Sequence, residues 1–491
     1  KTQITHTVNY EMLQSLPSAR DPWVVLQMAP AIMMDRENVG GVESGQQSGF
    51  VARGSGGNEW TVDGMQVTDK SSGGSPTYYD FDSFEEMNIS TGTLDVEHRD
   101  AGIVINMVTR RGGNKASLGG RFYWTNSKWQ KTVPQAKLDS LGLSGYNRAD
   151  DIKDFGFNAG GPIVKDKVWW WMSYGIQQVK TINQIDIHDD TYLNNYGAKL
   201  NLQIIPSNRL EVLYQLNDKI KFGRSSSEYF PPGWRQGSKG FFGAPIIKIQ
   251  DEQMFGNNLF LSVRLGSSNG GFGMRPENDL NAEKVSYYDY AGGFWYNSYY
   301  WFYSDRPHPY GVFQTQYFND NLFGTAHEMK FGFEVNNNTA TYQGAWYGNG
   351  NLNVFRNYNS RTIDWNLDGT RENVLADDGL DIARISVRRF DTATTTGTKR
   401  IAAYFSDTIT AKRFNFNIGV RFDHAKDYDK PATFRGLWLP GQEVPYPQMK
   451  NYADITQTFF GGAETVDAIA PLLPDTLRPY SAPPKLFWFF S

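Results

Sequence analysis

"FNFNIGVRFD", the stretch from Phe414 to Asp423, alternates strictly between apolar and polar residues. The apolar residues occupy every second position: Phe414, Phe416, Ile418, Val420 and Phe422. Because successive side chains of a β-strand point to opposite faces, this stretch predicts a strand with one wholly apolar face and one wholly polar face.

The same alternation recurs elsewhere in the chain. Apolar residues take alternate positions from Tyr196 to Ile204, Leu210 to Leu216, Leu259 to Leu265 and Met329 to Val335. With the residues that flank them, we expect strands of roughly 8–11 residues, which matches a tilted strand that crosses a bilayer. An apolar face on one side and a polar face on the other are what a membrane barrel needs, with lipid outside and a wet lumen inside.

The connections between these segments alternate in length. Residues 162–167, 205–209 and 410–413 are tight turns, whereas 223–244, about 267–307, about 344–397 and about 427–484 are long and rich in Gly, Pro, Asn and aromatics. Short turns at one end and long loops at the other are typical of outer-membrane barrels. The alternative, a large soluble β protein, is expected to have short loops at both ends.

Composition excludes several other classes of protein. The 491 residues carry a formal net charge of -4, which gives no electrostatic case for nucleic acid, and no cysteine that could form a disulfide or a thiolate metal site. No run of about 18 apolar residues is present, so a bundle of spanning helices is excluded. The six His are scattered and no nucleophile–base arrangement is visible, so we expect no enzyme activity.

Residues 1–112 differ from the rest. The stretch 11–30 predicts a short amphipathic helix after a Ser or Asp start, with Pro22 near that start and Pro30 at its end. Residues 58–67 and 101–113 predict short buried strands bounded by Gly. We therefore predict a small α/β domain over 1–112, followed by a barrel over 113–491.

Two stretches of this first domain resemble the plug domain of TonB-dependent outer-membrane receptors. "GFVARGSGGNEWTVDGMQVTD" (49–69) has the Arg-Gly of Arg53 and Gly54, then a strand that ends in the Asp-Gly of Asp63 and Gly64. Residues 84–114 are similar to the end of the plug, which runs G-x-V-x-N-x-V-T-[KR]-x-G. That pattern is filled by Gly102, Val104, Asn106, Val108, Thr109, Arg110 and Gly112.

Two hairpins extend the resemblance into the barrel. Residues 159–174 look like the first hairpin of the Oar-like branch, whose plug follows a carboxypeptidase-regulatory-like domain, and 402–423 resemble a late-barrel hairpin of the superfamily. The resemblance implies a barrel of the 22-stranded type with the plug in its lumen. Only about 12 strands are recognisable, so we expect an incomplete record of a longer protein, with the signal peptide and TonB box upstream and more strands downstream.

The resemblance also implies a function in the outer membrane of a Gram-negative bacterium, surrounded by lipid and lipopolysaccharide. It implies energised uptake driven by the TonB–ExbB–ExbD complex acting on an upstream segment, with a plug held by many polar contacts and no resident cofactor. Peptide, glycan and siderophore all remain open as substrate. The alternative is a receptor-like component for adhesion, signalling or a secretion or surface complex, with surface lipoproteins or other envelope proteins as partners. A passive porin is disfavoured by the plug-like residues 1–112.

Aromatic loop residues are the candidates for substrate binding: Tyr229, Phe230, Trp234, Phe294, Trp295, Tyr299 and Tyr300. They could instead pack against one another or against lipopolysaccharide. Trp169, Trp170 and Trp171 directly follow a tight turn, so we interpret them as an aromatic girdle rather than a sugar-stacking platform.

Two polar motifs have two interpretations each. Asp63 and Gly64, with Arg53, could contact the barrel wall, or form a tight turn, and both can hold. Asp364, Asn366 and Asp368 match the first half of a calcium loop, with Glu372 nearby, but Leu375 stands where a bidentate Glu is expected. The alternative for this motif is a polar surface turn.

Overall fold

The computed structural model describes most of the chain up to residue 431. The described ranges are 4–15, 20–35, 38, 40–52, 57–92, 95–99, 102–224, 234–238, 244–276, 286–289, 294–296, 300–346, 352–356, 382–387 and 393–431. No helix within these ranges is long and apolar enough to cross a membrane.

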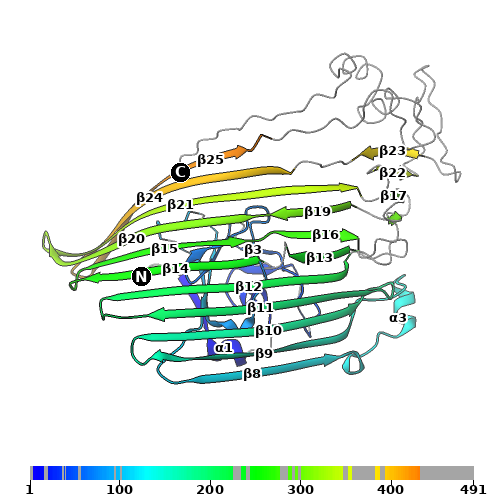
Figure 1. Cartoon of the computed structure of the whole chain (residues 1–491), viewed down its shortest axis with the longest axis horizontal. Helices are drawn as coiled ribbons and strands as arrows, with labels where there is room; N and C mark the ends of the chain where they lie inside the picture. Colours follow the sequence, from blue (N-terminus) through cyan, green and yellow to red (C-terminus); the bar gives the residue numbers. More distant parts are fainter. Residues whose placement is uncertain are drawn as a thin grey trace, which may run out of the picture.

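A 14-stranded antiparallel sheet forms a curved wall (Figure 1). Three of its strands are short: β13 (Trp234–Ser238), β16 (Phe272–Pro276) and β19 (Tyr300–Asp305). The eleven long strands are β8 (Ser117–Asn126), β9 (Arg148–Val164), β10 (Val168–Ile182), β11 (His188–Leu202), β12 (Asn208–Arg224), β14 (Ala244–Phe255), β15 (Leu259–Asn269), β20 (Pro307–Leu322), β21 (Thr325–Trp346), β24 (Thr394–Ala411) and β25 (Phe414–Asp429). The end strands of the described sheet are β8 and β25.

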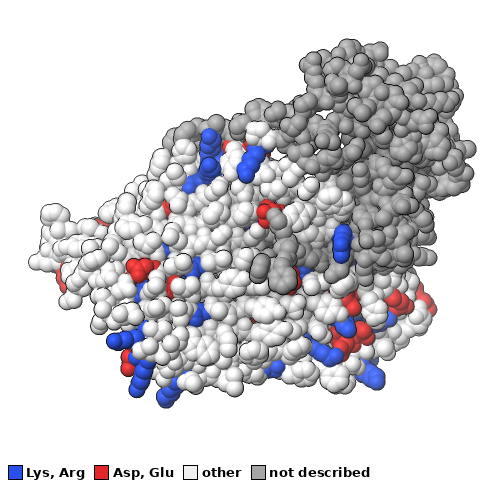
Figure 2. All heavy atoms as spheres, in the orientation of Figure 1, with Lys and Arg blue, Asp and Glu red and all other residues white. Residues whose placement is uncertain are grey.

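The alternation of the sequence sets which side of the wall each residue faces. All five apolar residues of the opening stretch, from Phe414 to Phe422, are more than half exposed on the outer side. On the opposite face of the same strand, Arg421 is only 10% exposed and lies against the concave side. The outer face is largely free of charge in the middle, as expected of a surface that meets lipid (Figure 2). The predicted facing is therefore confirmed.

The long strands are joined by tight turns at one end, called here the turn end, and mostly by long connections at the other, the loop end (Figure 1). The predicted strand lengths were too short, since β21 has 22 residues and β24 has 18. About ten residues cross a bilayer, so these strands extend beyond it at the loop end. There both faces are polar, as in Asn336–Asn338, and the alternation on which the prediction rested disappears.

Smaller elements accompany the long strands. Between β8 and β9 lie η2 (Ser127–Trp129) and α3 (Gln135–Ser140). A separate four-stranded sheet has the order β18-β17-β22-β23. Its strands are β17 (Ser286–Asp289), β18 (Phe294–Tyr296), β22 (Leu352–Arg356) and β23 (Ile382–Val387).

The described residues of 4–109, called here the inner body, lie on the concave side of the wall (Figure 1). Their main sheet has the order β1-β6-β7-β4-β5. Its strands are β1 (Ile4–Asn9), β4 (Glu59–Val62), β5 (Met65–Gln66), β6 (Phe84–Gly92) and β7 (Val104–Thr109), and β2 (Ile32–Met34) pairs separately with β3 (Phe50–Ala52). Trp23, Trp60 and Phe84 are among its fully or nearly fully buried core residues.

The short helix predicted within 11–30 after an Asp start is confirmed in α2 (Pro22–Leu26), but it ends at Leu26, before Pro30, and a second short helix was not predicted. That second helix is α1 (Tyr10–Ser15), and a 3-10 turn, η1 (Phe81–Ser83), precedes β6. Pro22 lacks an N–H and holds Asp21 in an extended conformation, which prevents one continuous helix. Asp21 instead caps α2 by accepting a hydrogen bond from the Trp23 N–H.

Candidate functional site

The turn between β4 and β5 presents the inner body to the wall near the turn end. Asp63 and Gly64 form this two-residue turn with φ of +46° and +72°, the left-handed pair that a tight hairpin favours. The Asp63 carboxylate accepts hydrogen bonds from the Thr109 N–H (2.8 Å) and hydroxyl (2.6 Å), and Asn106 Oδ1 accepts from the Gly64 N–H (3.0 Å). Both residues of the turn are thus fixed by β7.

Four wall residues hold this turn through a buried network. Lys199 Nζ lies 3.0 Å from Asp63 Oδ2 and 3.2 Å from Glu211 Oε2. Lys248 Nζ lies 2.6 Å from Glu211 Oε1 and donates to the Asp63 carbonyl at 3.0 Å. Arg264 donates to the Gly64 carbonyl at 2.6 Å. Two lysines and two carboxylates therefore pair completely.

A cavity of about 740 Å³ opens beside this network, and we call it the turn-end cavity. Its charged lining residues are Asp63, Glu85, Glu86, Glu211 and Glu252 on the acidic side and Arg111, Lys199, Arg209, Lys248 and Arg264 on the basic side. Acidic and basic side chains are equal in number, so the lining has no net formal charge.

A second buried cluster ties the inner body to β8 and β9. Arg121 contacts Asp80 (2.7 Å), Asp82 (3.0 Å) and Asp154 (2.7 Å), and Arg20 pairs with Asp82 and with Asp154. Burial raises the pKa of Asp80 against the effect of Arg121. For Asp82, burial works in the same direction, but Arg20 and Arg121 outweigh it and lower the pKa. Asp82 is therefore the carboxylate that the two guanidinium groups hold ionised.

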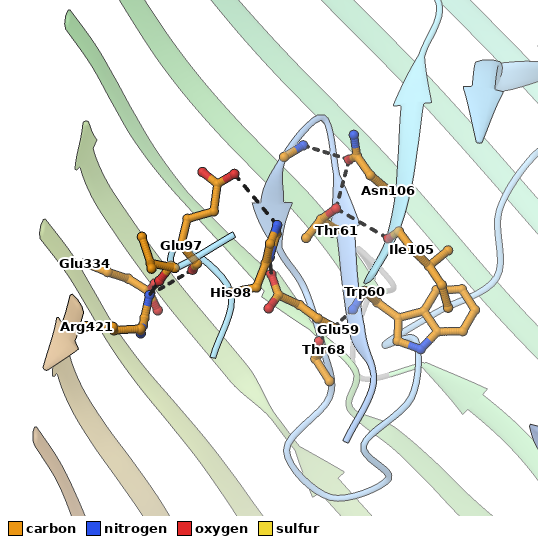
Figure 3. Close-up of polar contacts among 12 residues, drawn as sticks. Glu59, Trp60, Thr61, Thr68, Glu97, His98, Ile105, Asn106, Glu334 and Arg421 are labelled. Atoms are coloured by element: carbon orange, nitrogen blue, oxygen red, sulfur yellow. Dashed lines mark hydrogen bonds and ion pairs between the residues drawn. The ribbon is translucent and has the colours of Figure 1, made fainter. Parts of the chain in front are cut away.

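A third contact joins the inner body to β21 and β25, at the far end of the wall (Figure 3). His98 Nδ1 lies 3.2 Å from Glu59 Oε1, and Arg421 donates to the Glu97 carbonyl at 2.8 Å and approaches Glu334 at 3.3 Å. Burial opposes protonation of His98, but the hydrogen bond to Glu59 and the nearby acidic groups raise its pKa overall.

The middle of the wall, on β12 and β14, makes an apolar contact with the inner body. Leu213 of β12 and Ile246 of β14 are both fully buried and belong to the same hydrophobic cluster as the inner-body core. The expectation of a plug held by polar contacts is therefore incomplete, because these two wall side chains continue its core. We call them the apolar collar.

On the loop-end side of the collar lies a second cavity of about 380 Å³, the loop-end cavity. Inner-body residues 69–78 line one side, and β12, β16 and the start of the β15–β16 connection line the other. Its charged residues are Lys219, Arg224, Arg306 and Asp69. Arg306 lies 3.1 Å from Asp69 Oδ1, which also accepts from the Ser71 and Ser72 N–H groups.

Comparison with known proteins agrees with this architecture. No family model matches the chain. Over 139 residues the chain is 30% identical to the TonB-dependent transporter Oar of Myxococcus xanthus, a match that covers 27% of this chain and 13% of that protein. This relative belongs to the group that the sequence motifs resemble. The inner body lies on the concave side of the wall, where a plug is expected.

Over these 139 residues the chain is similar to an Oar-type TonB-dependent transporter.

Solved structures of such receptors share the fold at low identity. The outer-membrane transporter YddB from Escherichia coli superposes with a TM-score of 0.64 at 13% identity, over 88% of this chain and 61% of that one. The ferric citrate transporter FecA gives 0.57 at 13% identity, over 88% and 57%. The chain thus spans less than two thirds of these structures and a small part of Oar. Oar, YddB and FecA are each named as transporters, and YddB as one of the outer membrane.

Within this chain, the predicted plug residues divide into two groups. Asp63, Gly64, Asn106 and Thr109 come together at the turn-end network, as described above. Gly102 is elsewhere, packed so closely that an added Cβ would lie 1.8 Å from the Gly57 carbonyl oxygen. Arg110 donates to Asn158 of β9 at 3.2 Å and lies over the Tyr10 ring. Arg53 and Gly54 lie outside the described residues.

The substrate and calcium predictions fall largely outside the described part. Tyr229, Phe230 and Tyr299 are not described, and only the backbone placements of Trp234 in β13, Phe294 and Trp295 in β18, and Tyr300 in β19 are given. The calcium candidates Asp364, Asn366, Asp368 and Glu372 also lie outside it. Among the described residues, no group of three or more acidic or His side chains could hold a metal ion. Both hypotheses remain predictions.

The predicted girdle of three tryptophans needs correction. Trp171 is 2% exposed and faces the inside of the wall, and Trp169, on the same face, donates its indole N–H to Asn114 Oδ1 at 2.7 Å. Only Trp170 shares the outer face with Met172, which is 41% exposed. The period of two that makes a strand amphipathic also prevents three consecutive residues from facing lipid.

Sequence reasoning missed the charged wall residues of the interface, above all Lys199, Glu211, Lys248 and Lys219. A signal was available, because each is a charged residue on the polar face of an alternating strand. A long charged side chain that points into the lumen and is buried there needs a partner.

Proposed function

We propose that the protein takes up a substrate across the outer membrane, with energy supplied by the TonB–ExbB–ExbD complex. The observation that supports this most strongly is the extent of the interface. The inner body contacts the wall from β8, through Arg121, to β25, through Arg421. An inner body held along the whole described wall would obstruct the lumen of the barrel, so passage would require it to rearrange.

The order of strands in the inner body suggests where a pull would act first. β1 is an edge strand, paired only with β6 within the described sheet, and Val8 is its only buried residue. A force on the chain upstream of Ile4 would therefore separate β1 from β6 before it reached the turn-end network. The remaining strands would be drawn on only afterwards.

Uptake by cells with and without TonB tests this proposal. Cells that make the natural full-length protein would be compared in matched strains, one lacking functional TonB. Depletion of peptides, glycans and iron–siderophore complexes from the medium would be measured by mass spectrometry. We expect at least one class to be depleted only when both TonB and the protein are present.

Equal depletion in both strains would contradict the proposal. Uptake independent of TonB, together with a stable stoichiometric complex with other envelope proteins, would instead favour a role in adhesion, signalling or surface assembly.

A further inference from the structure

The loop-end cavity differs from the other polar contacts of the interface in one respect. Lys219 lies in it, is 6% exposed, and donates a hydrogen bond to the Tyr78 hydroxyl at 2.8 Å. The same ammonium lies 4.5 Å from the centre of the Tyr78 ring. Among the described residues, no carboxylate forms an ion pair with it. A buried ammonium with only a phenol as partner lacks the counter-charge that buried charges normally have.

The neighbouring lysine on the same face shows what Lys219 lacks. Lys221 lies two residues farther along β12 and is also buried, but it pairs with Asp189 of β11. Arg306, another cation that lines the cavity, pairs with Asp69. Lys219 therefore lacks a carboxylate partner of the kind that Lys221 and Arg306 have.

A second donor points into the same space. Asn217 lines the cavity two residues before Lys219 and is 4% exposed. Within the described part of the chain, its Nδ2 has no hydrogen-bond partner. A buried amide nitrogen without an acceptor is costly, and a bound oxyanion would accept from both Asn217 and Lys219.

The remaining lining limits the shape of the ligand. Tyr78 and Phe272 supply aromatic surface, and Ser71, Ser72 and Thr77 supply hydroxyls. A volume of about 380 Å³ lies at the small end of ligand pockets. The site therefore suits a small molecule with an anionic group at one end and an apolar or aromatic part beside it.

We propose that the loop-end cavity is a binding site for a small molecule bearing a carboxylate or another oxyanion, with Lys219 and Asn217 as its anchors. This proposal adds a ligand class to the proposed uptake function. It rests on that function in one respect, namely that the ligand arrives from the loop side. It names the charge class of the ligand, which the fold alone leaves open.

The test uses the natural full-length protein, purified in detergent, and three probes of nearly equal shape. Phenylacetate carries a carboxylate, phenyl phosphate carries a phosphate, and phenylacetamide is neutral. Binding would be measured by isothermal titration calorimetry. We expect at least one anion to bind saturably and about tenfold or more tighter than the amide, because a hydrogen bond to a charged group is the stronger kind. The two anions distinguish a carboxylate site from a phosphate site.

Variants assign the binding to the cavity. Lys219→Met should weaken the preferred anion at least about tenfold, and Lys219→Arg should largely restore it. Lys167→Met, in an exposed turn at the turn end, removes the same charge and should leave binding unchanged. Tyr78→Phe removes the acceptor now occupied by Lys219 and keeps the ring, so it should maintain or strengthen anion binding.

Equal binding of the anions and the amide, or no saturable anion binding, would overturn the proposal, as would unchanged binding in Lys219→Met. If that variant does not fold, a clear loss of anion binding in Tyr78→Phe would contradict it. The assay contains no TonB, so its failure is separate from a failure of the uptake experiment.

Discussion

The two cavities at the interface contain similar residue types but differ in how completely their charges are paired. At the turn end, five acidic and five basic side chains line the space, and the central lysines each contact a carboxylate. At the loop end, Asp69 is occupied by Arg306 and backbone N–H groups, and Lys219 forms no ion pair with any carboxylate of the described residues. The turn end is a completed structural contact, whereas at the loop end Lys219 has no counter-charge within the described part of the chain.

Residues of a single strand, β12, line both cavities. The inner face of β12 runs from Glu211 in the turn-end cavity, past Leu213 in the apolar collar, to Lys219 in the loop-end cavity. These ends are eight residues apart, roughly 26 Å along a strand. The role of each buried charge therefore depends on its partners. Glu211 pairs with the two lysines that contact Asp63 of the inner body, whereas Lys219 is available to a ligand.

The largest expected effect comes from removing one charge from the turn-end network. Lys248→Met removes one of the cations that contact Glu211 and leaves the Asp63 carbonyl without this donor. Removing one member of a buried ion pair costs about 3–5 kcal/mol, and we expect the lower end because Lys199 and Arg209 still contact Glu211. The measurement is urea unfolding of the inner body, followed by limited trypsin digestion. A loss below about 1 kcal/mol, the scale of an exposed pair, would show that the turn-end network is not structural.

The comparison also assumes that both cavities lie inside a wall whose outside meets lipid. Val420 is outward, 65% exposed, and six residues from the start of β25, so its side chain lies near mid-bilayer. Val420→Arg should cost about 2–4 kcal/mol in folding into lipid vesicles. Asn417→Arg, on the inner face, is the matched control and should be mild. The reverse order would show that the faces are assigned wrongly.

The cluster of Arg20 and Arg121 with three Asp residues is a second contact in which the charges are paired. Its contribution to stability can be measured as a function of pH. The pKa of Asp82 is lower in the folded protein than the unfolded value of about 3.9. Its contribution is therefore present above that pH and is lost as pH falls through the folded pKa. Asp82→Asn should cost about 1–3 kcal/mol at pH 7, with less further loss on acidification than in the wild type. Parallel pH curves of inner-body stability would contradict this.

The smallest expected effect concerns His98. Its folded pKa is raised, so its contribution is fully present below the unfolded value of about 6.5 and is lost as pH rises through the folded pKa. His98→Gln should remove about 1 kcal/mol at pH 6 and progressively less at higher pH. Urea midpoints at pH 6 and pH 9 check this. A variant that differs from the wild type equally at both values would show that His98 acts by packing alone.

Sequence alone predicted the facing of the wall strands, because alternation is a local property that one strand carries in full. It also placed Asp63, Gly64, Asn106 and Thr109 within one domain through the family resemblance. It did not predict where the strands end. At the loop end of β21, consecutive residues are polar on both faces, so no apolar–polar alternation marks the strand there.

The partners at the interface could not be predicted from periodicity. Lys199 and Asp63 are 136 residues apart, and Arg264 and Gly64 are 200 apart. Alternation shows that Lys199 points inward, but only the register of the sheet and the docking of the inner body determine which group it meets. For the same reason, the sequence of β12 does not distinguish the paired Lys221 from Lys219.

A paired charge-removal experiment tests the contrast between the two cavities most directly. Inner-body stability and phenylacetate or phenyl phosphate binding would be measured together in Lys248→Met and Lys219→Met. We predict a large loss of stability for Lys248→Met, and for Lys219→Met a change of no more than about 1 kcal/mol, because no carboxylate is left unpaired, with loss of anion binding. A large destabilisation by Lys219→Met with anion binding retained would contradict the account.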